Sequence, residues 1–414
     1  MVFIDGYTVS ALVAYAVLCA LLRYRQKHAI EAKFQMSLGD MTLLQAYEIQ
    51  KWLGEQEFPA TFSASIFFAL FKTYGVPSIS RLLVATGQIA DRNNSHDLER
   101  TSKRAADTSV LITNMVIGRP GSRRAIEAVA RTRFLHAGYR KDGKISDDDM
   151  LYTLSLFVLE PIRWVAQYEW RCLTDLERCA MATCWKALGE DLDIPYGRLP
   201  SSQEERGWSD ALHWLRELDE WSRAYAHQNV RLHKSNTILA GATMDMVIFK
   251  LPKIAKPAGQ YIVSIILGPG LRNAMGLPCP SPYHEAAFHG MIAIRKFIVR
   301  HLCLPRPYFL RRRHLLDHPD PQTGRYNVAR WRVHPWYARP SSSFKSLWSI
   351  GNWLRWMRGG PLSPPPSENK FLPEGYKIRE VGPSQFTGKG GKEMDKIEET
   401  LRGRSLDVCP FASL

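Results

Sequence analysis

The chain has 414 residues, 45% of them hydrophobic, which is enough apolar material for one large or two ordinary domains with a buried core. This composition excludes a disordered tail, and seven cysteines without a Cys-x-x-Cys pair argue against a disulfide framework or a thiolate zinc module and indicate a reducing compartment. The formal net charge of +15, from 55 basic and 40 acidic residues, favours nucleic acid or anionic lipid headgroups as partners without choosing between them.

An uncharged stretch rich in Val, Ala and Leu covers residues 6–22 and is followed by Arg23, Arg25 and Lys27. As a helix it spans roughly 25 Å, close to the thinner hydrocarbon core of the endoplasmic reticulum (ER). A cleaved signal peptide carries its positive charges before the apolar run, whereas here Asp5 precedes the run and the basic cluster follows it. We therefore predict an uncleaved transmembrane anchor at residues 6–22, with a buried N-terminal helix as the alternative.

The charges around this anchor also predict its orientation. Basic residues stay on the cytosolic side, so residues 1–5 are expected in the ER lumen and the rest of the chain in the cytosol. The sequon Asn93-Asn94-Ser95 tests this orientation, because it is glycosylated only if the body of the protein is lumenal. A later apolar run, residues 261–267, is interrupted by Gly268, Pro269 and Gly270, which fits a buried core segment better than a second span.

Residues 23–304 carry the patterns of a helical domain. Two capping-box patterns, Ser146 with Asp149 and Thr174 with Glu177, mark helix starts, and Pro161 is expected to end or kink the first of these helices. Behind these starts, apolar residues recur every three or four positions, as on one face of a helix. They are Leu176, Cys179, Ala180, Cys184, Ala187, Leu188, Trp214, Leu218, Trp221 and Tyr225. Alternating strand patterns are scarce, so we predict a mainly α fold, a compact helical bundle.

The composition changes after Leu304, where proline and glycine become frequent. This density prevents long helices, so residues 305–414 are predicted to form an irregular C-terminal region packed on the body. Its arginine triplet, residues 311–313, fits a solvated face or a contact with lipid headgroups. Nucleic acid is disfavoured as a partner because the triplet lacks the interleaved aromatic residues of RNA-binding segments.

Several motifs fail on spacing. His284 and His289 flank a segment similar to a zinc-protease helix, but five residues place them about 140° apart around a helix, so they cannot share a metal ion. Residues 387–392 have the composition of a phosphate loop without its spacing. Neither a Gly-x-Ser-x-Gly elbow nor a Gly-x-Gly-x-x-Gly motif after a strand is present, so hydrolase and dinucleotide functions have no starting point.

The stretch Arg131-Thr-Arg133-Phe-Leu-His136 is more informative. On a helix Arg133 and His136 project from one side, and upstream Arg104 and Thr108 also share a face. A haem requires a neutral imidazole on iron, cations for its propionates and a polar group beside the oxygen site. These four residues could supply that set, although a histidine among apolar neighbours also fits an ordinary core position.

Further segments resemble the catalytic-domain family that joins the fungal ER-bound oxygenase of mycophenolic acid biosynthesis (MpaB) with the bacterial rubber oxygenases, or latex-clearing proteins. In chain order they are residues 70–80, 131–138, 143–154, 293–297 and 373–376. The likeness to the fungal branch extends over nearly the whole chain. The rubber-oxygenase branch matches only through an Arg-x-x-x-Thr element and an Arg-x-x-His element.

The resemblance implies a helical bundle that holds haem b. It makes His136 the proximal iron ligand, with Arg133 one turn before it, and places Arg104 and Thr108 on a helix near the haem. Arg104, Thr108 and Arg133 are therefore the expected catalytic residues, and His136, Arg133 and Arg104 are expected to bind the cofactor. Rubber oxygenases have a lysine directly before the threonine where this chain has Asp107, so their sixth-ligand chemistry does not carry over.

The resemblance also implies a function, that of a single-pass ER-membrane oxygenase facing the cytosol. With dioxygen it would cleave a C=C bond in the prenyl side chain of a fungal secondary-metabolite intermediate, such as a farnesylated phthalide. A prenyl chain partitions into the bilayer, so the anchor and the substrate class agree. The alternative from another class is a non-catalytic membrane-anchored helical protein that binds or shuttles prenylated lipids, and a third is a peripheral basic scaffold.

Overall fold

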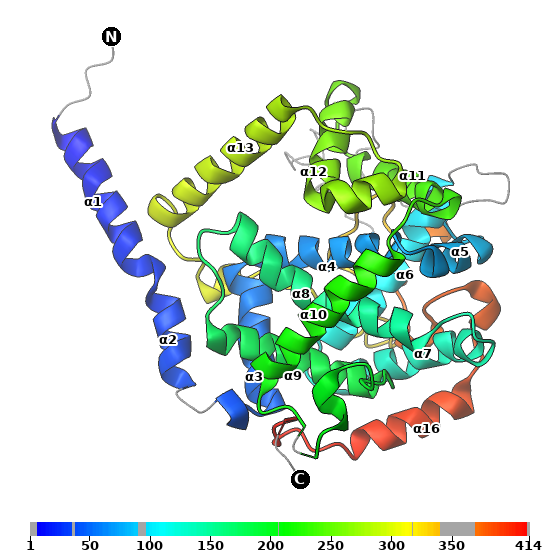
Figure 1. Ribbon diagram of the computed structural model, residues 1–414. Coiled ribbons are helices and arrows are strands. Elements are labelled where there is room, and N and C mark those ends of the chain that lie inside the picture. The colour runs from blue at the N-terminus through cyan, green and yellow to red at the C-terminus, as the bar shows by residue number, and fades with distance from the viewer. Residues whose placement is uncertain are drawn as a thin grey trace.

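The computed structural model describes residues 6–34, 38–89, 97–205, 207–316, 318–339 and 369–411 (Figure 1). The α-helices are α1 (Gly6–Arg23), α2 (Arg25–Lys33), α3 (Leu43–Trp52), α4 (Pro59–Thr73), α5 (Pro77–Ala85), α6 (Leu98–Val116), α7 (Arg123–Lys141), α8 (Asp147–Tyr168), α9 (Asp175–Asp191), α10 (Ala211–Asn229), α11 (Lys234–Ile248), α12 (Lys256–Met275), α13 (Pro282–His301) and α16 (Gly391–Arg402). Across these ranges, extended pairing is limited to one bridge between Tyr326 and Tyr376. The mainly α prediction is confirmed.

Helix α1 lies outside the bundle at one edge of the molecule (Figure 1). It continues, after a break at Tyr24, into α2, and the stretch Tyr7–Lys33 is the one candidate membrane span among the residues that the structure describes. Its most apolar window is only 11% buried against the protein, so α1 is not a core helix. The sequon at residues 93–95, which would test the orientation of this helix, lies outside the described residues.

The principal core forms where α4 packs along α8 and α3 packs along α9. Both predicted helix starts are present: Ser146 Oγ accepts a hydrogen bond from the Asp149 N–H (3.0 Å), and Thr174 and Glu177 form a full capping box. Helix α8 does not end at Pro161 but continues through it, and the alternative of a kink at this residue stays a prediction. Proline removes a single backbone donor, and the packing of the buried Pro161 in the core maintains the helix across the missing bond.

The predicted apolar faces of α9 and α10 point into this core. Cys179, Ala180, Trp214 and Leu218 are all fully buried. A second core joins α4 with α11 and α12. In α12 the backbone leaves helical geometry at Gly268 (φ 81°), which is where the sequence predicts an interruption and where only glycine adopts such a conformation without strain.

The C-terminal region packs on the body through a third core. Val110 of α6 and Ala128 of α7 meet Tyr337, Tyr376 and Val381 there. Residues 318–339 and 369–390 consist mainly of turns and short 3₁₀ segments, as their proline and glycine content predicts, whereas α16 is a regular helix that packs on α7. The division of the chain at residues 22 and 304 stays a prediction.

Candidate functional site

A cavity of about 780 Å³ lies between α4, α6, α11 and two stretches of the C-terminal region, residues 312–315 and 327–336. This volume is in the range of small-molecule and cofactor pockets. Helix α6 forms one wall, starting from the N-cap Asp97, whose carboxylate accepts from the N–H groups of Glu99 and Arg100. Of the residues predicted for the site, Arg104 and Thr108 line this cavity.

The cavity has one aromatic and one basic wall. Helix α4 and the turn after it contribute Phe62, Phe67, Phe71 and Tyr74. Another part of the lining, which we call the basic wall, consists of Lys250, Arg312, Arg313, Arg330 and Arg332. The described residues that line the cavity include no aspartate or glutamate. The cavity therefore favours a ligand with an apolar body and an anionic or oxygen-rich group.

The arginines of the basic wall crowd one another. Burial lowers the pKa of Arg312, and the charges of Arg330 and Arg306 lower it further. Burial, followed by the charge of Arg312, likewise lowers the pKa of Arg332, whose guanidinium lies 4.1 Å from the centroid of the Phe67 ring. Part of the 311–313 triplet thus turns inward, and an anion bound here would relieve the repulsion between like charges.

Arg104 and Thr108 present free polar groups at the cavity. Neither side chain has a hydrogen bond or an ion pair within the described ranges, although each is half-buried. Arg104 also lies near Tyr74: burial raises the pKa of that phenol to about 12, and the charge of Arg104 acts in the opposite direction. An arginine without a carboxylate partner at a cavity wall is free to bind an anionic ligand group.

His136 lies on α7, which starts at the N-cap Ser122. It shares a helical face with Thr132, whose hydroxyl lies 3.7 Å from the sulfur of Met115, so this face of α7 is turned towards α6. In the part of the chain that the structure describes, the imidazole has no hydrogen-bond partner. Burial, together with the charges of Arg104 and Arg140, lowers the pKa of His136 to about 4.

These properties leave the imidazole neutral at cellular pH, with a lone pair available for a metal. His136 is enclosed enough to lose most of its hydration, yet it keeps some accessible surface. It is not among the residues that line the 780 Å³ cavity. Arg104 links His136 to the cavity, because Arg104 lines the cavity and its charge lowers the pKa of His136.

Arg133 does not reach the cavity wall. Its Nη1 donates to the carbonyl oxygen of Asp191 (3.3 Å), the last residue of α9, and its Nη2 lies 3.7 Å from the Asp193 carboxylate. Arg140 bonds the same turn, through the carbonyl of Asp193 (3.0 Å). Both arginines therefore hold α7 against the C-terminal end of α9, where the helix dipole favours a cation.

Arg131, the first residue of the same motif, is fully buried. Its Nε donates to the carbonyl of Val381 (2.8 Å) and its Nη2 to that of Phe386 (3.1 Å). The sequence analysis did not predict a structural role for Arg131, because nothing in the motif distinguishes this arginine from Arg133. Arg131 anchors the C-terminal region to the helix that carries His136.

Asp107 points away from the cavity. Its carboxylate accepts from Lys103 Nζ (2.6 Å) and from the Tyr337 hydroxyl (2.7 Å), in the core shared with the C-terminal region. Asp107 thus helps to pack α6 against the C-terminal region. This role agrees with the sequence difference at this position, where rubber oxygenases have a lysine.

Two cavity histidines were not found from the sequence. His314 Nε2 lies 2.9 Å from the carbonyl oxygen of Gly54, and His334 Nδ1 lies 2.8 Å from the hydroxyl of Ser102. Burial lowers the pKa of His314, and the nearby Arg312 adds to this effect. Both histidines belong to the proline-rich region that was predicted as irregular, where no periodicity marks an inward-facing side chain.

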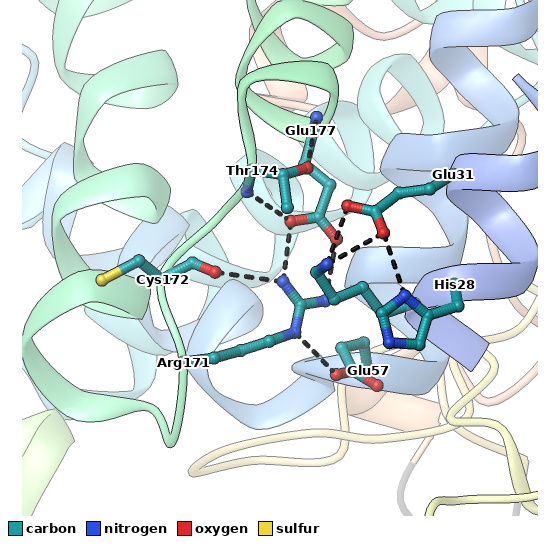
Figure 2. Close-up of polar contacts among 8 residues, drawn as sticks. His28, Glu31, Glu57, Arg171, Cys172, Thr174 and Glu177 are labelled. Atoms are coloured by element: carbon teal, nitrogen blue, oxygen red, sulfur yellow. Dashed lines mark hydrogen bonds and ion pairs between the residues drawn. The ribbon is translucent and has the colours of Figure 1, made fainter. Parts of the chain in front are cut away.

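His314 meets a π-helical turn, Leu53–Glu57, which a buried ion-pair cluster holds in place. Figure 2 shows Arg171 between Glu57 and Glu177: the guanidinium bonds both carboxylate oxygens of Glu177 (2.7 and 2.8 Å) and lies 3.3 Å from Glu57. Burial lowers the pKa of Arg171, but the two carboxylates outweigh it and raise the pKa above its ordinary value. This cluster has the character of structural support for the cavity wall.

Within the described residues, no three His, Cys, Asp or Glu side chains converge as metal ligands. A metal bound by protein groups alone would need such a set, whereas a porphyrin supplies four nitrogens and requires one axial protein ligand. An unpartnered neutral imidazole near Arg104, which forms no ion pair within the described residues, is chemically suited to haem.

Comparison with known proteins shows where this chain has relatives. Residues 65–296 match the family described as "ER-bound oxygenase mpaB/B'/Rubber oxygenase, catalytic domain". The chain is 39% identical to ER-bound oxygenase mpaB' of Penicillium brevicompactum over 407 residues, which cover 97% of this chain and 93% of that protein. It is 37% identical to mpaB of the same organism over 358 residues (86% and 82%) and 42% identical to mpaB of Penicillium roqueforti (strain FM164) over 274 residues (65% and 89%).

Proposed function

Because the chain belongs to the family of ER-bound mpaB/B' oxygenases and rubber oxygenase catalytic domains, we propose that it is a haem-dependent oxidoreductase that cleaves an alkene with dioxygen. The substrate is the prenyl side chain of a fungal secondary-metabolite intermediate, such as a farnesylated phthalide. The observation that carries the proposal is the neutral, unpartnered imidazole of His136 within range of the unpaired Arg104 at the cavity.

Haem b, when bound, would supply the activation of dioxygen. His136 would hold the haem iron, since burial and the charge of Arg104 keep its imidazole neutral and its lone pair free over a wide range of pH. Arg104 would bind a propionate or stabilise negative charge on oxygen, and Thr108 would donate a hydrogen bond into the cavity. Arg133 is a positioning residue that fixes the orientation of α7 through its contact with Asp191.

The two walls of the cavity suit the proposed substrate. The aromatic side chains of α4 would hold the prenyl chain and exclude water, and the arginines of the basic wall would bind its polar head. The reaction balances with dioxygen as the sole oxidant: the C=C bond breaks, two C=O bonds form, and each product receives one oxygen atom.

The proposed location is the ER membrane. Helix α1 would cross the bilayer once, with residues 1–5 in the lumen and the cavity on the cytosolic side, since the basic cluster follows α1. The relatives are known as ER-bound oxygenases, which supports this location.

The test is an optical spectrum and a cleavage assay on full-length protein purified with haem supplied during expression. We expect a Soret band and carbonyl products from a farnesylated phthalide, and both should disappear in His136→Ala. His318→Ala, at an exposed histidine, is the matched control. If the wild-type protein were colourless and still cleaved the alkene, the reaction would use a cofactor other than haem. A full Soret band in His136→Ala would show that His136 is not the iron ligand.

A further variant separates the oxygenase from a non-catalytic lipid carrier. Ala105 lines the cavity on α6, and Ala105→Trp would fill part of it. An oxygenase should keep its Soret band in this variant and lose turnover. A non-catalytic carrier, in contrast, would show no turnover even in wild type: it would bind the prenylated compound and release it unchanged.

A further inference from the structure

Exposed apolar side chains gather on α13 and on the segment after it. In the described residues outside α1, large exposed hydrophobic side chains are concentrated between residues 283 and 316. They are Tyr283, Met291, Ile294, Phe297, Ile298, Leu302, Leu304, Tyr308, Phe309, Leu310 and Leu316. Such a contiguous apolar surface marks a contact with another phase or another molecule.

Helix α13 itself is scarcely packed. Of its 20 residues only Phe288 is buried, and its attachment to the body includes the contact of Arg295 with Glu169 (2.8 Å). At 100° per residue, four exposed side chains fall within about 120° of one another. They are Met291, Ile294, Phe297 and Ile298, and with Tyr283 they form what we call the α13 face.

This face adjoins the predicted anchor. The Tyr15 hydroxyl donates to the carbonyl oxygen of Leu302, at the end of α13 (3.1 Å), and both helices lie at the same edge of the molecule in Figure 1. Tyr15 is near the middle of α1, roughly 12–14 Å along the axis from either end. A bilayer that takes in the whole of α1 therefore also reaches the end of α13.

We propose that the α13 face and residues 302–310 form a second membrane-contact surface beside α1. This inference rests on the proposed anchoring of α1 and goes beyond it, because a single anchor would leave the body free to tumble above the membrane. Two contacts hold the body in one orientation.

The occupant that fits this surface is lipid rather than protein. Lys296 and Arg300 lie on the side of α13 away from the apolar arc, about 160° and 120° from its centre, as basic residues do on the polar face of an interfacial helix. The aromatic rings of Tyr283, Tyr308 and Phe309 are highly exposed, as are those that sit at membrane interfaces. The surface is also continuous with α1, whose own apolar side chains are exposed.

The membrane-contact surface and the cavity are neighbours along the chain. Residues 302–310 lead directly into residues 312–315, which line the basic wall of the cavity.

The test is spin labelling of the full-length protein in vesicles of phosphatidylcholine with phosphatidylserine. Single cysteines replace Phe297 or Ile294, in a background where Cys172, Cys279 and Cys303 are serine. Val13→Cys on α1 is the lipid control, and Lys392→Cys on the exposed side of α16 is the water control. Accessibility to oxygen, which concentrates in lipid, is compared with accessibility to a water-soluble nickel chelate.

We expect labels at 294 and 297 to resemble the label at 13, with several-fold higher oxygen access and several-fold lower nickel access than the label at 392. Nickel access at 297 equal to that at 392, with position 13 in lipid, would overturn this inference and leave the anchor intact. Low access to both reagents at 297 would show a protein partner and would also overturn it. Nickel access at position 13 would contradict the anchor itself.

Discussion

The guanidinium of Arg104 on α6 lies close enough to His136 on α7 to lower the pKa of that imidazole. The two residues come from different helices, and the same arginine lines the cavity. A cation in this position favours the neutral imidazole, and because Arg104 forms no ion pair among the residues that the structure describes, its guanidinium can bind an anion.

Replacement of Arg104 is therefore expected to weaken haem binding. Arg104→Gln removes a charge-assisted bond to a propionate, worth about 1.5–3 kcal/mol, so the dissociation constant for haem should rise about 10- to 100-fold. Arg104→Lys should retain part of the affinity. Spectroscopic titration of the haem-free protein measures this, with the exposed Arg119→Gln as control. Equal affinity in all variants would show that Arg104 does not touch the cofactor.

The haem-free protein should lose stability as the pH falls from about 6.5 to 4. His136 stays neutral in the folded state, where its pKa is about 4, but it takes up a proton in the unfolded chain near its ordinary value of 6.5. Protonation therefore favours unfolding in this window, by up to about 3 kcal/mol. Thermal denaturation across this pH range should show a shallower slope in His136→Gln than in wild type or His318→Gln. An unchanged slope in His136→Gln would contradict the low pKa.

Arg131 is expected to act on stability. Arg131→Met leaves the carbonyl groups of Val381 and Phe386 without their donor, which should lower the free energy of unfolding by about 2–4 kcal/mol. Limited trypsin digestion should then cut within residues 378–391 sooner than in wild type. Haem content per folded molecule should be unchanged, and a loss of haem without a loss of stability would instead place Arg131 at the cofactor.

Replacement of Asp107 by the lysine that rubber oxygenases have at this position should not create a sixth ligand for the haem iron. Asp107→Lys places a second ammonium group beside Lys103 in a buried position, and loss of such a buried pair costs about 3–5 kcal/mol. Asp107→Asn, which can still accept from the Tyr337 hydroxyl, should cost less. Denaturation of both variants measures this, and an amine-ligated haem spectrum in Asp107→Lys would show that this residue does face the iron.

Local patterns in the sequence predicted much of the fold. The caps at Ser146 and Thr174, the buried face of α9 and the break at Gly268 each depend on residues close together in the chain, so propensity and periodicity are sufficient to find them. The sequence left open whether Pro161 ends or kinks α8, and the helix continues through it because burial in the core outweighs the local preference to stop. The predicted family was confirmed by the match of residues 65–296.

The sequence by itself determined the helical fold, the apolar N-terminal helix and the membership of the oxygenase family, since these follow from composition, short-range spacing and likeness to relatives. Only the tertiary structure decided which polar side chains share a space. It brought Arg104 within range of His136 and directed Arg133 to the end of α9. It also paired Asp107 with Tyr337. Finally, it folded the proline-rich C-terminal region into a cavity wall that contains His314 and a cluster of arginines. Pairings between distant segments depend on how whole helix faces pack, and no periodicity in the chain encodes them.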